Sequence, residues 1–468
     1  MKKITLALVL ICVICACLFS QQSYYVSANG NNNNDGLSEE TALRSLSLAY
    51  QKASAGNIKR IMVIGRIGDW SEEAGNNEFI FDLRSGNDAE ILITGDPGAN
   101  RTSSRAAALT GSRSEKSILA VRGRTRIEHL WIYGGEMSNE NQDGIKVFSV
   151  LTQGPGVEIG DLGGIGVSIE RGGTYSLFGN THPGRGSDVG FNNGCRRGSI
   201  VNRGTFIFHS GFLKGFSSRI PHPIVHNSGT FIMNGGTIGH HTNSENGGGV
   251  YNMGTFTMNG GSIRLNRSSK NGGGVYNSGT FTLNNGSVSS NTAEEDGGAI
   301  FNAGILLIAN GHINGNNARN GGGVFSAAFR RDASFTMTGG DFAHNKAAED
   351  GGGVYISFGL TTENVFSMSG GRIWTNTANN YGGGVYVAGV RQDLVNTIVG
   401  GIFTQSGGDI FANTAKLGGG ILVMRYNGRY DRTGGTVRDN RTTHVSDEAI
   451  QGSNSNVFRA RGALGAGW

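Results

Sequence analysis

The chain contains little cysteine and little proline for its length. Only four cysteines and five prolines occur in 468 residues, and three of the cysteines, Cys12, Cys15 and Cys17, lie in the first 17 positions. Cys195 alone is certain to remain once a leader is removed, so no internal disulfide can hold the fold together. Despite 80 glycines, the chain has no Gly-X-Y period and so cannot be a collagen. Stability must therefore come from packing.

Charge and long apolar runs are scarce as well. The formal net charge is +5, and it falls to +3 without Lys2 and Lys3, which is too small and too dispersed to indicate nucleic-acid binding. No segment after Ser20 is long and apolar enough to cross a bilayer. The ten histidines lack metal-ligand spacing, and the adjacent pair His240 and His241 would point to opposite faces of a strand. We expect neither a metal nor another cofactor.

The first residues have the pattern of an export signal. Met1-Lys2-Lys3 precedes an apolar run from Ile4 to Phe19, and cleavage after Ser20 would leave Gln21 as the new N-terminus. The same region contains Ile14-Cys15-Ala16-Cys17, which resembles the lipobox of bacterial lipoproteins and would make Cys17 the acylated residue. Both interpretations predict an exported chain, either held at the cell surface or outer membrane or released outside the cell. Contact with a membrane would then depend on the lipid alone.

A repeat explains the abundance of glycine. The block Gly-Gly-Gly-Val-Tyr, or a close variant, recurs at successive spacings of 25, 25, 24, 30, 31 and 36. Its copies begin at Gly247, Gly272, Gly297, Gly321, Gly351, Gly382 and Gly418. A second block, Gly-Thr-Phe, recurs at even spacing from Gly204 to Gly279. A third block consists of a glycine, a small residue and an aliphatic residue, as in Gly236-Thr237-Ile238. Each repeat therefore holds three short runs of β-forming residues between glycine or asparagine turns.

The runs alternate apolar and polar residues, as strands with one buried face do. Phe256 and Met258 alternate with Thr255 and Thr257. Three such strands make a triangular coil, and coils stacked about 4.8 Å apart would bury their apolar faces against one another. The sequence thus predicts an all-β fold, a right-handed parallel β-helix or solenoid with three short strands per coil of about 25 residues.

Stacking in register predicts columns of like residues. One internal column comprises Phe206, Phe231, Phe256 and Phe281, and another comprises Ile238, Ile263, Val288 and Ile313. A ladder of asparagines is predicted at Asn202, Asn227, Asn252, Asn277 and Asn302. Each would adopt a left-handed turn and bond to its copy in the next coil. We interpret these asparagines as structural.

The repeat divides the chain into regions. We expect a signal at 1–20, a cap of one strand and one helix at 21–57, irregular coils at 58–200 with a projecting loop at 181–197, regular coils at 201–440, and a tail or closing cap at 441–468. Ser38 is the predicted helix N-cap and Gly56 the stop. The predicted buried helix face comprises Ala42, Leu43, Leu46, Ala49, Tyr50 and Ala53. Such a plug is needed because an open end of a β-helix exposes strand edges.

Two family resemblances follow from these motifs. Tyr24-Tyr25-Val26-Ser27, followed by Asn29-Gly30, resembles the opening of pectate-lyase-like β-helix proteins. Asn291-Thr292-Ala293 leading to Gly297-Gly298-Ala299-Ile300 resembles the repeat of polymorphic outer membrane proteins, over about half the chain. Members of that second family usually end in a C-terminal membrane barrel that exports the rod, whereas the stretch from Asn440 to Trp468 is too short to form one. We therefore expect any attachment to use Cys17 or a partner.

The β-helix resemblance makes a carbohydrate-active enzyme, a polysaccharide lyase or glycoside hydrolase, the alternative function. Asp143-Gly144-Ile145 resembles the Asp-Gly-Ile turn of polygalacturonase-like hydrolases, which makes Asp143 the catalytic candidate. The partner carboxylates of such sites are missing from the sequence around it. Asp296 and Asp350 precede glycine triplets and are expected to be solvated turn residues.

An outward aromatic column supplies the candidate contact surface. If Val250 and its copies face the core, the residues that follow them face outward, namely Tyr251, Tyr276, Phe301, Phe325, Tyr355 and Tyr386. These rings could stack on sugars or on a partner protein, or they could pack on one another to protect the strands. We predict a non-catalytic secreted or surface-exposed protein that is adhesive and contacts a glycan or a host or cell-surface protein.

Overall fold

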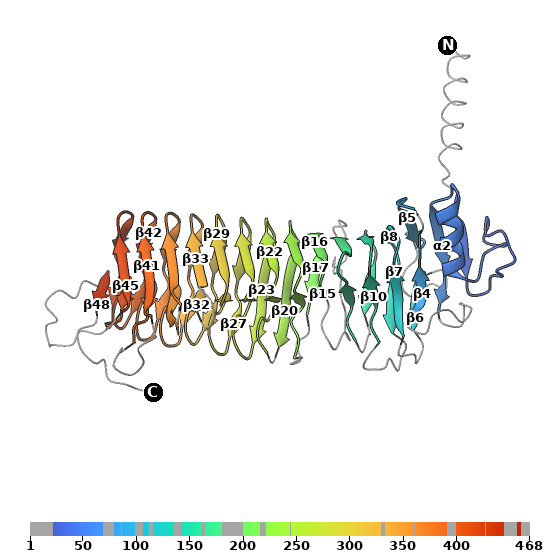
Figure 1. Cartoon of the computed structure of the whole chain (residues 1–468). Helices are drawn as coiled ribbons and strands as arrows, with labels where there is room; N and C mark the ends of the chain where they lie inside the picture. Colours follow the sequence, from blue (N-terminus) through green and yellow to red (C-terminus); the bar gives the residue numbers. More distant parts are fainter. Residues whose placement is uncertain are drawn as a thin grey trace, which may run out of the picture.

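The chain forms a rod built from stacked coils, and helix α2 (Leu46–Ala55) lies at its N-terminal end (Figure 1). The computed structural model describes residues 22–68, 79–85, 87–98, 106–111, 116–134, 142–160, 164–179, 200–215, 221–243, 245–328, 333–359, 362–390, 399–425, 427–443 and 456–459. The signal at 1–20, Cys17, Cys195 and the predicted loop at 181–197 lie outside these residues. The architecture is the right-handed parallel β-helix that the repeat predicts.

Two long parallel sheets run along the rod, and successive coils add one strand to each. Sheet 1 has 15 described strands: β1 (Tyr24–Ser27), β2 (Arg60–Ile64), β5 (Ile91–Thr94), β8 (Thr125–Glu128), β11 (Val150–Gln153), β14 (Thr174–Phe178), β16 (Thr205–Ser210), β19 (Thr230–Met233), β22 (Thr255–Met258), β25 (Thr280–Leu283), β29 (Ile305–Ile308), β33 (Ala333–Met337), β37 (Asn364–Met368), β41 (Gly401–Gln405) and β45 (Arg429–Arg432). Sheet 2 has 14: β4 (Phe79–Leu83), β7 (Ser117–Val121), β10 (Ile145–Val147), β13 (Val167–Ile169), β15 (Ile200–Asn202), β18 (Val225–Asn227), β21 (Val250–Asn252), β24 (Val275–Asn277), β28 (Ile300–Asn302), β32 (Val324–Ala328), β36 (Val354–Gly359), β40 (Val385–Val387), β44 (Ile421–Val423) and β48 (Val457–Arg459).

The third side of the rod changes along its length. In the N-terminal coils it is the four-stranded sheet 4: β3 (Arg66–Ile67), β6 (Ala108–Gly111), β9 (Trp131–Gly134) and β12 (Glu158–Gly160). Further on it is sheet 3, which begins with β17 (Phe212–Lys214), β20 (Thr237–Asn243) and β23 (Ser262–Ser268). One branch continues through β26 (Ser287–Ser289), β30 (His312–Asn314), β34 (Asp341–Ala343), β38 (Arg372–Trp374), β42 (Asp409–Phe411) and β46 (Thr436–Arg438). The other continues through β27 (Thr292–Ala293), β31 (Asn317–Ala318), β35 (Lys346–Ala347), β39 (Thr377–Ala378), β43 (Thr414–Ala415) and β47 (Arg441–Thr442).

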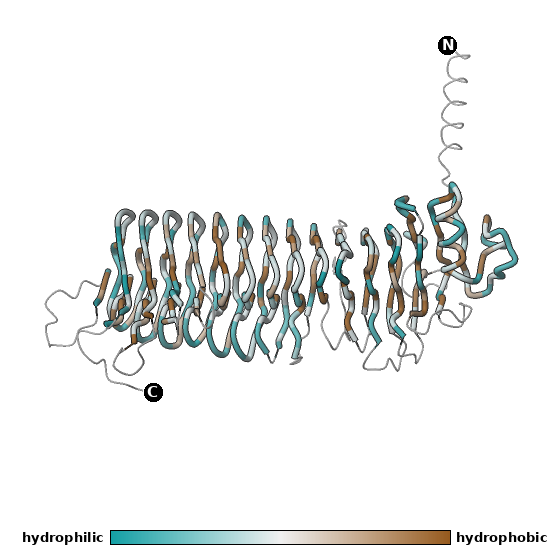
Figure 2. Tube along the Cα trace, in the orientation of Figure 1, coloured by the Kyte–Doolittle hydropathy of each residue, from teal (hydrophilic) through white to brown (hydrophobic). Residues whose placement is uncertain are grey.

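The core consists of the predicted columns. Phe206, Phe231, Phe256 and Phe281 have no exposed surface, and neighbouring rings stack with centroids 4.4–4.8 Å apart. Ile238, Ile263, Val288 and Ile313 are equally buried on sheet 3. Apolar and polar stretches recur from coil to coil along the rod (Figure 2). In-register stacking is confirmed by the pairing of Phe256 with Phe281 across β22 and β25.

The asparagine ladder forms, although its backbone differs from the prediction. Asn252 Nδ2 donates to Asn277 Oδ1 at 2.8 Å, and Asn227 Nδ2 donates to Asn252 Oδ1 at 2.7 Å. These asparagines end strands of sheet 2 and keep extended backbone, so the expected left-handed turn is wrong. The amide can reach its copy from a strand end because the coils are in register.

A second buried ladder runs along sheet 3. It comprises Asn266, Asn291, Asn316, Asn345, Asn376, Asn413 and Asn440. The residue before each member has positive φ, and except at Gly315 it is not glycine, as with Leu265 at 57° and Ser290 at 55°. Left-handed backbone is unfavourable for such residues. The ladder compensates, since each asparagine side chain bonds to the coils on both sides.

The ladders allow a matched stability test. Asn252→Ala should cost about 2–3 kcal/mol, because the buried amide serves Asn227, Asn277 and the Thr280 carbonyl, and their partner atoms would be left without hydrogen bonds. Asn259, which makes the same amide-to-amide bonds on the surface, is the control, and Asn259→Ala should cost below about 1 kcal/mol. Denaturant unfolding measures both. Equal losses would contradict a stabilising role for the buried ladder.

The N-terminal cap differs from the prediction at its start. Helix α2 spans Leu46–Ala55, and its N-cap is Ser45, whose hydroxyl accepts from the Leu48 amide at 3.1 Å; the prediction of Ser38 is wrong. Leu43 precedes the helix and forms a bridge with Val26, so this stretch is extended. The predicted stop at Gly56 is confirmed by its amide, which donates to the Lys52 carbonyl at 2.9 Å. The helix packs on β1, β2, β4 and β5 and covers the end of the core.

Candidate functional site

The predicted aromatic column is present on the outer side of sheet 2. Val250 and its copies lie in the core, and the following residues stack in one row. Centroid distances from Tyr251 to Tyr386 are 4.9, 5.1, 5.2, 4.6 and 4.6 Å. The row also includes His226, whose ring stacks on Tyr251 at 5.2 Å with planes 9° apart. Sequence reasoning missed His226, although it precedes Tyr251 by one period of the repeat.

Exposure along the column is uneven. Phe301, Phe325 and Tyr386 are buried, with 3%, 8% and 7% of their surface exposed, whereas Tyr251 and Tyr276 are half-buried. Because each internal ring has another ring on both faces, a ligand can reach only ring edges and hydroxyl groups there. Stacking of a sugar on a free ring face is therefore possible only where the column ends. Packing of the aromatics on one another accounts for the middle.

A ladder of polar side chains lies beside the column, just before the glycine triplets. The Asp296 amide donates to Asn271 Oδ1, Asn320 Nδ2 donates to Asp296 Oδ1 at 3.0 Å, and the Asp350 amide donates to Asn320 Oδ1 at 3.1 Å. The Tyr381 amide then donates to Asp350 Oδ1 at 3.1 Å. The expectation that Asp296 and Asp350 are solvated turn residues is wrong, because both are partly buried members of this ladder.

The two carboxyl groups differ in charge compensation. Arg319 Nε lies 3.5 Å from Asp296 Oδ1, and burial still raises the pKa of Asp296 above its ordinary value. Burial raises the pKa of Asp350 to about 7, and the nearby Glu349 adds to the shift. The pKa of Tyr355 is raised by burial and then by the charges of Asp350 and Asp296, which places both carboxyl groups near the column.

This arrangement predicts pH-dependent stability. An aspartate has a pKa of about 3.9 in an unfolded chain, so Asp350 binds its proton more tightly when folded, and stability should fall as pH rises from about 4 to about 7. Asp350→Asn keeps the acceptor for Tyr381 and should gain about 1–2 kcal/mol at pH 8 but almost nothing at pH 4. Asp296→Asn, where Arg319 already offsets the charge, should gain less. Thermal unfolding of the three proteins at both pH values tests this, and an equal gain at pH 4 and pH 8 would contradict it.

Asp143, the catalytic candidate, takes part in contacts between coils. Its Oδ1 accepts from the Ile165 amide at 2.8 Å, and its Oδ2 lies 4.0 Å from Lys146 Nζ. A Cβ on Gly164 would overlap this carboxylate. Asp143 therefore fixes the turn of the following coil, a structural role that an asparagine could largely fill.

Within the described ranges, no group of three histidine, cysteine, aspartate or glutamate side chains is placed to hold a metal ion. No helix in the described part of the chain is long and apolar enough to cross a membrane. No protein-family model matches the chain, and the comparisons with curated proteins and with solved structures found no match either.

Proposed function

We propose that the chain is a non-catalytic, exported adhesive protein whose rod contacts glycans or a protein on a host or cell surface. One observation carries the proposal, namely the aromatic column that continues over seven coils on the outer side of sheet 2. The half-buried Tyr251, Tyr276 and Tyr355 offer ring edges and hydroxyl groups on successive parts of this column, which suit repeated weak contacts with an extended partner.

Export is part of the proposal. The mature chain would begin at Gln21 or at an acylated Cys17, and the intact mass of the mature protein distinguishes the two. The resemblance of the repeat to that of polymorphic outer membrane proteins, which are surface proteins, supports this part of the proposal by analogy.

The contact surface can be tested without disturbing the stack. Tyr251→Phe and Tyr276→Phe keep the stacked rings and remove only the hydroxyl groups, so stability should be unchanged while binding to cells or to a glycan array falls stepwise, about threefold to tenfold per change. Tyr25→Phe, the same change at a half-buried tyrosine in the first coil, is the control.

Two outcomes would contradict the proposal. Binding by the double variant equal to that of the unchanged protein would leave the column purely structural. Turnover of a uronic-acid polymer that disappears in Asp143→Asn would favour the enzyme alternative, because catalysis depends on a few positioned groups.

A further inference from the structure

The aromatic column stops at His226, and the position before it in the same row is aliphatic. Val201 of β15 pairs with His226 of β18, which in turn pairs with Tyr251 of β21. The row thus changes from rings to an aliphatic side chain between two neighbouring coils. His226 is the ring at which the stack ends, and Tyr251 covers only one of its faces.

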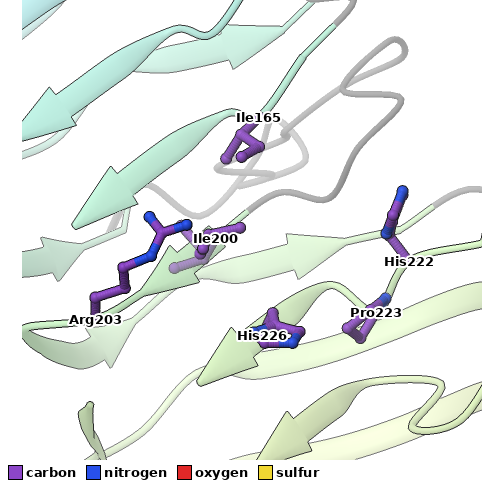
Figure 3. A pocket seen from close by; sticks show the side chains of 7 residues that line it. Ile165, Ile200, Arg203, His222, Pro223 and His226 are labelled. Carbon is purple, nitrogen blue, oxygen red and sulfur yellow. The ribbon is translucent and has the colours of Figure 1, made fainter. Parts of the chain in front are cut away.

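A cavity of about 220 Å³ lies at this end of the column (Figure 3). Ile165, Val201 and Pro223 contribute apolar walls, and Arg203, His222 and His226 contribute basic groups. The lining residues come from three successive coils, so the cavity forms only when the coils stack. Its volume is below the roughly 300–1,000 Å³ of pockets for drug-sized ligands, which suits a single ring with one substituent.

Arg203 and His222 are both close enough to His226 to affect its charge. The pKa of His226 is lowered by burial and then by the charges of Arg203 and His222. Arg203 Nη1 lies 3.2 Å from Ser168 Oγ and 3.5 Å from Glu170 Oε1, and its side chain stays 46% exposed. Glu170 also accepts from Ser168 Oγ at 2.8 Å. The long contact with Glu170 leaves most of the guanidinium's donors available to a ligand.

We propose that this cavity binds an acidic sugar unit, with its carboxylate or sulfate between Arg203 and the two histidines and its ring against His226 and the apolar wall. A guanidinium binds such planar or tetrahedral anions through paired hydrogen bonds, and an imidazole adds a donor when protonated. The site differs from the tyrosine edges of the proposed function. It shares with that proposal the choice of sugars as ligands and the ring of His226, at which the column ends.

Matched sugars test the proposal on the purified chain lacking residues 1–20. Methyl glucuronide and glucose 6-sulfate should bind by calorimetry at least about tenfold more tightly than neutral methyl glucoside, because only they carry the anion. Saturation with either should raise the pKa of His226, followed by NMR of labelled histidine, by about one unit, since a nearby negative charge favours imidazolium. Arg203→Gln should weaken both by about tenfold, while Arg264→Gln, at an exposed arginine of β23, should not.

Each contrary result is informative. Equal binding of the neutral sugar would overturn the site, and so would an unchanged pKa of His226 when the acidic sugar is saturating. The pKa is measured on the unchanged protein, so this test does not depend on whether Arg203→Gln folds. Inorganic sulfate binding as tightly as the sugars would overturn the sugar assignment. Tyr251→Phe and Tyr276→Phe should leave these affinities unchanged, so failure here and failure of the proposed function are distinguishable.

Discussion

Deleting Gly254 to Ser278 is expected to leave a folded rod one coil shorter. The deletion removes one full period of the repeat, so Phe281 would take the place of Phe256 beside Phe231, and Asn302 would take the place of Asn277 beside Asn252. Each coil contacts only its neighbours, and the new neighbours match the old ones. The β-sheet circular dichroism per residue and the unfolding cooperativity should therefore be retained.

A deletion of about half a period, from Gly254 to Leu265, supplies the contrast. It would join Met253 directly to Asn266, which belongs to another side of the coil. Buried and exposed positions after the junction would then no longer match those of the neighbouring coil. We expect loss of cooperative unfolding and of much of the β signal. Similar behaviour of the two deletions would contradict in-register stacking as the source of stability.

Phe256→Ala should cost about 3–5 kcal/mol, the largest effect expected of a single substitution here. The ring is fully buried and stacks on Phe231 at 4.4 Å and on Phe281 at 4.5 Å, and a β-helix wall cannot close over the resulting cavity without breaking register. Thr257→Ala, at the adjacent half-buried position on the outer face, is the control and should cost less than half as much. Equal losses in denaturant unfolding would mean that the assigned strand faces are wrong.

Much of the fold was predictable because the period is simple. A constant period assigns every residue a copy in the next coil, so the columns of Phe256 and Ile263 and the ladder of Asn252 followed from counting. The second ladder carries the same signal at Asn291 and Asn316, but its left-handed neighbours vary from leucine to serine to histidine. No residue type in the sequence indicates the left-handed backbone before each asparagine, because hydrogen bonds between coils impose it.

The predictions that failed at the cap and at the site did so for physical reasons. The apolar spacing of Leu43 and Leu46 fits a helix, yet the strand bridge to Val26 extends the chain before Ser45. Asp296 and Asp350 are polar residues in turns, and only the loops around them explain why burial raises the pKa of each. The cavity at His226 depends on where the aromatic row stops. The sequence shows this end of the row only once the pairing of Val201 with His226 in neighbouring coils is known.

The direction of the hydrogen bonds has a mechanical consequence. Strands cross the rod, so the bonds between coils lie along its long axis (Figure 1). Tension between the two ends of the rod would therefore load the coil interfaces in series, and the outermost coil would peel away first while the next remained intact. A rod of this kind would extend in many small steps under load instead of rupturing at once, and each step would dissipate part of the applied force.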